Sequence, residues 1–450
     1  MKIHLIAIGG AVMHNLALEL QELGCQVTGS DDQIWDPTKS RLANAGLLPS
    51  QMGWFPEKIT QDMDMVILGM HAKSDNPELL QAKNLNIKIL SFPEFIFEHA
   101  QHKQRIVVAG SHGKTTTTAI LLHVLKENQI KFDYLVGSSV SGFSNMVHLS
   151  KEAPILVAEG DEYLASPLLP VPKFLVYQPH IVVLTGIAWD HINVFESEEV
   201  YYQQFEKLLL LLPKAGTVIY NSEDSKVVNL VSRCVKPDIH YAIPYETAMF
   251  KYKSTYTEYR LAGEKGTTQL FGKHNFSNIS AAWQVCRILG LSATQFIQPM
   301  INFQSPDKRM QTTVTEKNGI LIQDFAHAPS KAKATVEAVS SRFEKKEVIA
   351  CLELHTFSSL NTQFLPQYAD SLSAAKQKII FVNDQIVEKK GLSRLNDEVI
   401  QQAFQDNNIT ILRTKQALIE TLKPMTNQKT VLLMMSSGDF GGLKLTDLVS

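Results

Sequence analysis

The sequence predicts an α/β protein of three consecutive domains, each built on a mainly parallel sheet. Its 450 residues are too many for one hydrophobic core, because domains commonly hold about 150 residues. Short apolar runs recur along the whole chain, and most are followed by a segment whose apolar residues have helical spacing. Glycines and polar residues stand at the ends of these runs, where open parallel sheets place their ligand sites.

The composition indicates a globular protein without an electrostatic surface for nucleic acid. Hydrophobic residues make up 44%, charged residues 20%, and the net charge is −2. The longest apolar runs, such as 208–212, are far shorter than the roughly 20 residues of a membrane span. The first residues lead into an apolar run without a small-residue cleavage site, so we expect a cytoplasmic protein with no nucleic-acid or membrane partner. The cysteines form no C-x-x-C pair, which favours reduced thiols.

The N-terminal region has the pattern of a nucleotide-binding fold. An apolar run over 3–8 ends in Gly9-Gly10 and is followed by a helical pattern that stops at Gly24. The next run ends at Ser30-Asp31, where dinucleotide folds place a carboxylate for a ribose hydroxyl. The glycines do not complete G-x-G-x-x-G, which argues against a dehydrogenase. We predict a Rossmann-like domain over residues 1–101 and a linker in segment 98–104.

A strand, a glycine-containing loop and a helix over residues 107–118 indicate a phosphate-binding site. The loop reads Gly110-Ser111-His112-Gly113-Lys114-Thr115-Thr116. Backbone N–H groups of such a loop can surround phosphate, while the lysine supplies a charge and the threonine an oxygen for Mg²⁺. Val108 stands where the full G-x-x-x-x-G-K-[ST] pattern has its first glycine. The alternative is a turn with a solvated lysine, but the flanking strand and helix favour the phosphate site.

Two further strand ends of this domain carry candidate ligands. The run 155–158 ends in Glu159-Gly160-Asp161-Glu162, and clustered carboxylates beside a triphosphate suit Mg²⁺. The run 181–185 precedes Asp190-His191, in which the acid can orient the histidine ring. In the helix after Gly272, the first-turn amides of Asn275 and Asn278 are either caps or contacts to a base. We place this central domain at residues 102–305.

The third domain is predicted over residues 306–450. A break at 305–309 precedes the strand 320–323, which ends in Asp324-Phe325-Ala326-His327-Ala328 and a helix that starts with Pro329. Strands follow at 348–352, 378–382 and 431–435. The loops after the first and last of these are predicted to face one cleft.

Taken together, these motifs resemble the ordered motif set of the Mur ligase family over nearly the whole chain. The resemblance implies a Rossmann-like N-terminal domain, a central domain like the P-loop ATPases and a Rossmann-like C-terminal domain. It implies catalytic roles for Lys114, Glu159, His191, Arg309 and His327. ATP would be bound by Gly110, Ser111, His112, Gly113, Lys114, Thr115, Thr116, Asn275, Asn278, Arg309 and Asp324. One magnesium ion would lie on Thr115 and Glu159 and a second on His191.

The resemblance also implies the activity, an ATP-dependent, ADP-forming ligase of peptidoglycan metabolism that makes a C–N bond through an acyl phosphate. Its donor would be UDP-N-acetylmuramate, bound by Gly9, Gly10, Ala11, Met13, Ser30, Asp31 and His71. The acceptor would be L-alanyl-γ-D-glutamyl-meso-diaminopimelate, with L-alanine as the alternative, and would meet His355, Ser437 and Asp439. A protein that binds ATP as a switch, without ligation, is a more remote alternative.

Besides Gly160, a sterically mild replacement of an alanine, three positions depart from the family pattern. Gly186 and Ala188 stand where asparagine and glutamate are usual, and His355 stands where an arginine is usual. The first two exchanges affect contacts near His191. The third replaces a permanent bidentate partner for carboxylates by a titratable one.

Overall fold

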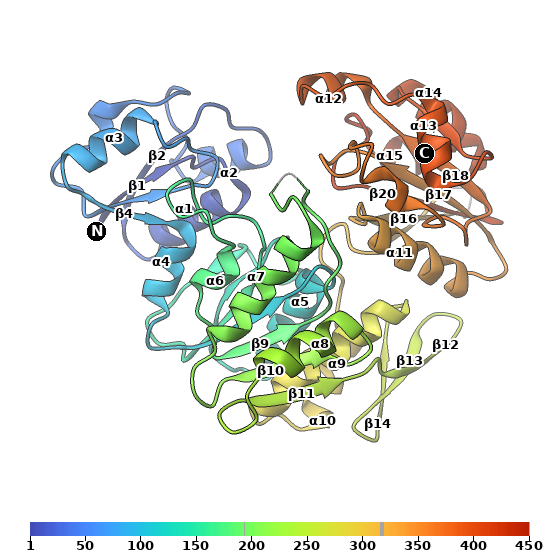
Figure 1. Ribbon diagram of the computed structural model, residues 1–450, viewed down its shortest axis with the longest axis horizontal. Coiled ribbons are helices and arrows are strands. Elements are labelled where there is room, and N and C mark those ends of the chain that lie inside the picture. The colour runs from blue at the N-terminus through green and yellow to red at the C-terminus, as the bar shows by residue number, and fades with distance from the viewer. Residues whose placement is uncertain (193, 316–318, 450) are drawn as a thin grey trace.

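The computed structural model describes residues 1–192, 194–315 and 319–449, which form three lobes in chain order (Figure 1). Each lobe contains its own sheet, and in this view the N-terminal and C-terminal lobes lie above the central lobe, to its left and right (Figure 1). Within the described residues, no helix has both the length and the apolar character needed to cross a membrane. The mainly parallel α/β fold predicted from the sequence is confirmed.

The N-terminal lobe is a four-stranded parallel sheet in the order β2-β1-β3-β4. Its strands are β1 (Lys2–Ile6), β2 (Gln26–Ser30), β3 (Met65–Leu68) and β4 (Lys88–Ser91). Its helices are α1 (Ala11–Glu22), α2 (Thr38–Asn44), the 3-10 helix η1 (Pro56–Lys58), α3 (Pro77–Asn84) and α4 (Phe92–His99). Every residue of β3 is buried, as expected for a strand covered on both faces.

The central lobe is organised by a seven-stranded sheet in the order β11-β10-β9-β5-β8-β6-β7, parallel except for β7. Its strands are β5 (Gln104–Ala109), β6 (Asp133–Leu135), β7 (Val147–His148), β8 (Ile155–Glu159), β9 (Ile181–Leu184), β10 (Thr217–Asn221) and β11 (Tyr241–Tyr245). Its helices are α5 (Lys114–Glu127), α6 (Lys173–Val176), α7 (Glu198–Leu210), α8 (Ser225–Cys234), α9 (Lys273–Ile288), α10 (Ala293–Ile297) and η2 (Pro299–Asn302). Strand β5 lies between β9 and β8. The loop that follows it therefore lies in the middle of the carboxyl edge of the sheet, where ligands bind in such folds.

A small antiparallel sheet extends the central lobe toward the C-terminal one (Figure 1). It consists of β12 (Met249–Tyr252), β13 (Thr257–Leu261) and β14 (Glu264–Thr268). The ring of Phe250 stacks on that of Phe276 in α9, with 4.2 Å between centroids. The sequence does not predict this sheet, because its strands are short and β12 lacks a buried face.

The C-terminal lobe has a six-stranded sheet in the order β15-β16-β20-β17-β18-β19, in which only β15 pairs antiparallel. The strands are β15 (Gln311–Val314), β16 (Ile320–Asp324), β17 (Glu347–Glu353), β18 (Gln377–Phe381), β19 (Thr410–Leu412) and β20 (Thr430–Met435). The helices are α11 (Pro329–Arg342), η3 (Leu365–Tyr368), α12 (Asp384–Lys389), α13 (Asp397–Phe404), α14 (Lys415–Leu422), η4 (Lys423–Met425) and α15 (Thr446–Val449). The edge strand β15 is exposed throughout and had no hydrophobic signal in the sequence.

The predicted linker over 98–104 was wrong in extent. Helix α4 continues to His99 and β5 begins at Gln104, so only four residues connect them. The reason is a buried acid. Asp133 lies 2.9 Å from His99 Nε2 and 2.7 Å from Lys103 Nζ, so the connection packs against the central lobe instead of extending into solvent.

Candidate active site

The loop between β5 and α5 has the backbone conformation of a phosphate cradle. Gly110 and Gly113 have φ values of 126° and 73°, a region that favours glycine. A Cβ at Gly110 would lie 2.3 Å from Thr185 Oγ1, and one at Gly113 would lie 2.2 Å from Asn278 Oδ1. The glycines are therefore required by both conformation and space, and they leave the loop amides at the start of α5, where an anion is stabilised.

Backbone groups anchor this loop at Gly186 and Ala188, two of the positions that depart from the expected pattern. The carbonyl of Gly186 accepts a hydrogen bond from Ser111 N at 2.9 Å, and Ala188 N donates to Ser111 Oγ at 2.8 Å. The hydroxyl of Tyr201 lies 2.9 Å from the same Oγ. Since these contacts at positions 186 and 188 use main-chain atoms, the loop is anchored without the asparagine and glutamate side chains.

Lys114 is held by an acid that the sequence analysis had not assigned. Its Nζ lies 2.7 Å from Gly110 O and 2.6 Å from Glu162 Oε2. Burial opposes the charge on Lys114, but the facing carboxylate of Glu162 outweighs it and raises the pKa of the lysine. Burial likewise opposes the charge on Glu162, yet Lys114 and His191 hold the pKa of that carboxyl far below its usual range. The signal for Glu162 was present in the sequence as the carboxylate cluster.

Oxygen ligands suited to Mg²⁺ meet next to this lysine. Thr115 Oγ1 donates to Glu159 Oε1 at 2.8 Å, and Glu159 Oε2 accepts from Gly137 N at 2.7 Å. Within the described ranges, no group of three His, Cys, Asp or Glu side chains is arranged to hold a metal. This donor set fits Mg²⁺, which commonly takes one or two carboxylates and fills its other positions with water and phosphate oxygens.

His191 belongs to the same cluster through Glu162. Its Nε2 lies 3.0 Å from Glu162 Oε1, and its backbone N–H donates to Asp190 Oδ1 at 2.8 Å. The residue has φ 60°, a left-handed conformation that costs roughly 1–2 kcal/mol for a non-glycine residue. The Asp190 hydrogen bond holds the backbone there, whereas the ring nitrogen contacts Glu162 and lies 3.8 Å from Asp190 Oδ2, so orientation of the ring by Asp190 stays a prediction.

Arg309 approaches the phosphate loop from the C-terminal lobe. Its Nη2 donates to Thr115 Oγ1 at 3.4 Å, and its guanidinium lies 4.4 Å from the ring centroid of Phe325. The carboxylate of Asp324 accepts from Met310 N and Ala326 N, each at 2.8 Å. In this structure Asp324 thus shapes the backbone next to Arg309, and a ribose contact for it stays a prediction.

Two more contacts join the C-terminal helix α11 to the loops of the central lobe. Lys331 Nζ lies 3.3 Å from Asp190 Oδ2, and His112 Nε2 lies 2.7 Å from Ser330 Oγ. His327 Nε2 is 3.8 Å from the same Asp190 oxygen. Burial and the charge of Lys331 lower the pKa of His327 to about 3, so its ring is neutral at neutral pH. Nothing in the sequence pattern had pointed to Lys331.

In the N-terminal lobe, the predicted sugar-nucleotide residues surround the turn after β1. Gly9 N donates to Asp31 Oδ2 at 2.7 Å, and Ser30 Oγ accepts from Lys58 at 3.1 Å. Burial raises the pKa of Asp31 to about 6. Of the remaining members, Gly10 caps α1, Ala11 and His71 are exposed, and Met13 is buried. His71 therefore lies on the surface, at the end of β3.

Comparisons with known proteins agree with this geometry. Residues 2–104 match the model described as "Mur ligase family, catalytic domain", residues 108–286 the "Mur ligase middle domain" and residues 308–438 the "Mur ligase, glutamate ligase domain". A UDP-N-acetylmuramate–L-alanine ligase of Caldicellulosiruptor bescii is 31% identical over 392 residues, which cover 84% of this chain and 83% of the relative. The chain belongs to the Mur ligase family.

Two solved structures show the same fold in Mur ligases. A murein peptide ligase from Psychrobacter arcticus superposes with a TM-score of 0.69 at 21% identity, covering 100% of this chain and 99% of that one. A UDP-N-acetylmuramate–alanine ligase from Thermotoga maritima gives 0.72 at 20% identity, covering 98% and 96%. As a Mur ligase, the protein is an ATP-dependent enzyme that forms a C–N bond and releases ADP.

Asn275 and Asn278 of this Mur ligase, which the sequence allowed to be either helix caps or contacts to a base, are not helix caps. No side chain caps the start of α9. Asn275 Nδ2 donates to Phe271 O at 2.8 Å, and Asn278 Nδ2 donates to Asn275 Oδ1 at 3.3 Å. Because a Cβ on Gly113 would collide with Asn278 Oδ1, this amide lies directly against the phosphate loop. That position favours the nucleotide interpretation over capping.

The predicted acceptor residues lie in the loops at the carboxyl ends of β17 and β20. These are the two loops that were predicted to face one cleft. His355 Nδ1 and Ser437 Oγ are buried atoms without a hydrogen-bond partner among the described residues. Asp439 is exposed. Burial lowers the pKa of His355, although the nearby Glu353 opposes this, so the ring is neutral near pH 7. The loops of this Mur ligase thus leave polar atoms free for a ligand.

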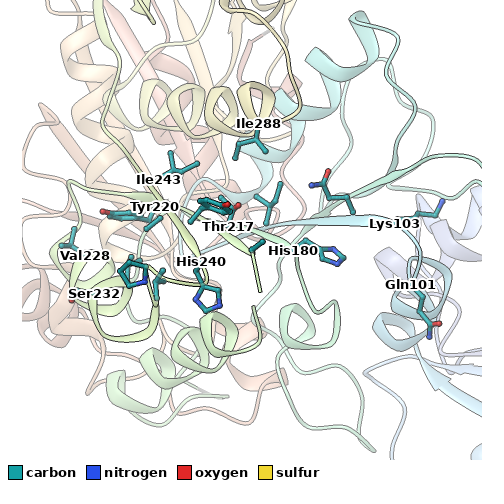
Figure 2. Close-up of a pocket in the computed structure, with 18 of the residues that line it drawn as sticks. Gln101, Lys103, His180, Thr217, Tyr220, Val228, Ser232, His240, Ile243 and Ile288 are labelled. Carbon is teal, nitrogen blue, oxygen red and sulfur yellow. The ribbon is translucent and has the colours of Figure 1, made fainter. Parts of the chain in front are cut away.

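A cavity of about 1200 Å³ lies away from all these residues. It is bordered by the starts of β9, β10 and β11, with Thr217, Tyr220 and Ile243 lining it from the sheet (Figure 2). This is the amino edge of the central sheet, opposite the phosphate loop. Its size does not make it the active site, because none of the predicted site residues borders it.

Proposed function

We propose that the protein joins the carboxylate of UDP-N-acetylmuramate to the tripeptide L-alanyl-γ-D-glutamyl-meso-diaminopimelate in peptidoglycan recycling. The observation that carries this proposal is the acceptor side of the site. His355 and Ser437 each offer a buried polar atom without a partner, and Asp439 adds a charge at the rim. A single small amino acid needs fewer contacts than these two loops offer, whereas a peptide can use all of them.

The proposed reaction follows from the residues around the phosphate loop. An oxygen of the muramyl carboxylate attacks the γ-phosphorus of ATP and ADP leaves, which gives an acyl phosphate. The acceptor nitrogen then adds to the carbonyl carbon, the tetrahedral intermediate expels phosphate, and the nitrogen loses a proton. Lys114 and Arg309 are placed to offset charge on the transferring group, where one such interaction commonly contributes about 3 kcal/mol. Bound Mg²⁺ would supply further charge stabilisation on the phosphate oxygens.

We assign the magnesium ions to two places. Thr115 and Glu159 would hold the first ion with phosphate oxygens, and His191 would hold the second, in exchange for its present contact with Glu162. We also propose that ATP lies between domains 102–305 and 306–450 and the sugar nucleotide on domain 1–101. With such substrates we expect the enzyme to act in the cytoplasm.

L-Alanine is the second candidate acceptor, because the relative in Caldicellulosiruptor bescii carries the name UDP-N-acetylmuramate–L-alanine ligase. A single pocket for one carboxylate would be enough for it. His355 stands where an arginine is usual, and this exchange weakens the case for L-alanine, because guanidinium is the usual bidentate partner for a small carboxylate.

A competition assay tests the proposal. UDP-N-acetylmuramate and ATP are held fixed, both acceptors are offered together, and the two products are separated by mass. We expect the tripeptide to have the higher kcat/KM. A value for L-alanine more than about 10-fold above that of the tripeptide would replace the proposal by the alanine ligase.

A further inference from the structure

A buried acid at the end of β17 has one oxygen without a partner. Glu353 is 1% exposed. Its Oε2 accepts hydrogen bonds from Phe440 N, at 2.9 Å, and from the hydroxyl of Ser436. Its Oε1 has no partner among the described residues. Buried polar atoms are nearly always hydrogen-bonded, so half of this carboxylate is available to a donor that does not come from the chain.

The free oxygen faces other unmet polar atoms. His355 Nδ1, itself without a hydrogen-bond partner, lies 3.9 Å from Glu353 Oε1. Gly438 borders both side chains, since a Cβ there would lie 2.8 Å from Glu353 Oε2 and 2.8 Å from His355 Nδ1. A glycine at this position keeps the space beside the carboxylate open.

The charge of Glu353 is not balanced by the protein. Among the described residues, its one basic neighbour within salt-bridge distance is His355. Burial, the largest effect, lowers the pKa of that histidine, so the ring carries little charge near pH 7. The nearby Lys308 amine donates instead to Gly438 O at 3.4 Å. A buried carboxylate without a cation is costly, and a cationic group on a ligand would remove that cost.

The position of Glu353 separates this subsite from the reacting phosphate. Asp324, Met435 and Leu352 are in register on the adjacent strands β16, β20 and β17. Strands are spaced by about 4.8 Å, so the end of β17 lies about 10 Å from Asp324. Arg309, packed near Asp324, reaches Thr115. Three extended residues span about 10 Å, and the γ-linkage and the diaminopimelate side chain make the tripeptide longer still, so its distal ammonium can reach past Asp324 to the end of β17.

We propose that Glu353 binds the distal, non-reacting ammonium group of a peptide acceptor, with the α-amino group of the same peptide at the acyl phosphate. This inference rests on the proposed function. The diaminopimelate residue of the tripeptide carries one free ammonium group beyond its peptide bond. L-Alanine has a single amino group, which must be free to react, and so it cannot occupy both places. Glu353 is thus a specificity residue for acceptors with a second ammonium.

The test measures KM and kcat for wild type and Glu353→Gln with matched acceptors. The glutamine keeps an oxygen for Ser436 and Phe440. The acceptors are the tripeptide, an analogue with 2-aminopimelate in place of diaminopimelate, which lacks only the distal amino group, and the dipeptide L-alanyl-γ-D-glutamate. We expect the substitution to raise the KM of the tripeptide about 10- to 100-fold. The KM of the analogue and that of the dipeptide should change less than about 3-fold.

Two results would overturn the inference. An equal rise in KM for all three acceptors would mean that Glu353 only holds the loop 436–440. If the variant does not fold, the wild type decides alone: equal KM values for the tripeptide and its 2-aminopimelate analogue would exclude an ammonium subsite. Failure of the proposed function would give a different result from these two. The wild type would then use L-alanine and turn over none of the peptides, and the inference about Glu353 would be wrong as well.

Discussion

Replacing Lys114 by alanine should lower both turnover and stability, for separable reasons. The lysine side chain is 13% exposed and its partner Glu162 3%, with 2.6 Å between them. Removing the lysine takes away the charge proposed to face the γ-phosphate. It also leaves the buried carboxylate of Glu162 with His191 as its one side-chain partner at hydrogen-bond distance among the described residues. The first effect acts on the reaction, and the second acts on folding.

The structure supports a magnitude for each effect. One preorganised group that opposes transition-state charge contributes about 3–4 kcal/mol, so turnover should fall about 10²- to 10³-fold. Breaking a buried ion pair costs about 3–5 kcal/mol, and the remaining His191 contact favours the lower end. For a domain of about 200 residues, 3 kcal/mol corresponds to a Tm lower by about 6–12 °C.

The assays are phosphate release for turnover and calorimetry for Tm. In the double variant Lys114→Ala/Glu162→Gln the unpaired charge is gone, so most of the Tm should return while turnover stays low. The neighbouring pair Lys173–Asp161, also 2.6 Å apart but with the aspartate 38% exposed, provides the control: Lys173→Ala should cost less than about 1 kcal/mol. Turnover of Lys114→Ala within about 10-fold of wild type would refute the catalytic role. A double variant that melts as low as the single one would refute the charge argument.

Three further outcomes are expected. Gly113→Ala, at φ 73° and 2.2 Å from Asn278 Oδ1, should weaken ADP binding at least about 10-fold by calorimetry, whereas Gly290→Ala, at φ 90° with open space around it, should not. The KM for UDP-N-acetylmuramate should rise as pH falls from 7 to 5, because the pKa of Asp31 is about 6 and protonation removes an acceptor; a profile unchanged in Asp31→Asn would contradict this. X-ray scattering should show a smaller radius of gyration with an ATP analogue and UDP-N-acetylmuramate together, and Lys331→Ala, which loses the 3.3 Å contact with Asp190, should reduce that compaction; no change in wild type would exclude closure.

Much of the fold was accessible from the sequence because parallel strands covered on both faces are apolar throughout. The runs that end at Gly9, Ala109 and Ala158 all became strands. The elements that escaped prediction are those whose burial depends on a partner. Strand β15 is exposed on every residue, and β12 is defined by its pairing with β13. The linker was misjudged for the same reason, since its polar residues are held by the buried Asp133.

For the candidate site, local motifs predicted residues that act within one segment. The glycines around Ser111 and His112 predicted a turn between a strand and a helix, and the structure has one in which Gly110 and Gly113 have positive φ. By contrast, Lys331 contacts Asp190 across a sequence separation of 141 residues, and no local sequence pattern predicts such a contact. Glu162 was visible as one carboxylate of a cluster, but its selection as the partner of Lys114 depends on the direction in which the turn after β8 points its side chains.

The sequence by itself determined the family, the α/β class and the ATP-dependent ligase chemistry, because these depend on loops and periodicities written within a few residues. The tertiary structure decided which charges are paired and which are left open. Lys114 is neutralised by Glu162, whereas Glu353 is buried with one oxygen free. Burial and the approach of strands from distant segments set the electrostatic cost of a charge, and neither is encoded in the neighbours of a residue along the chain.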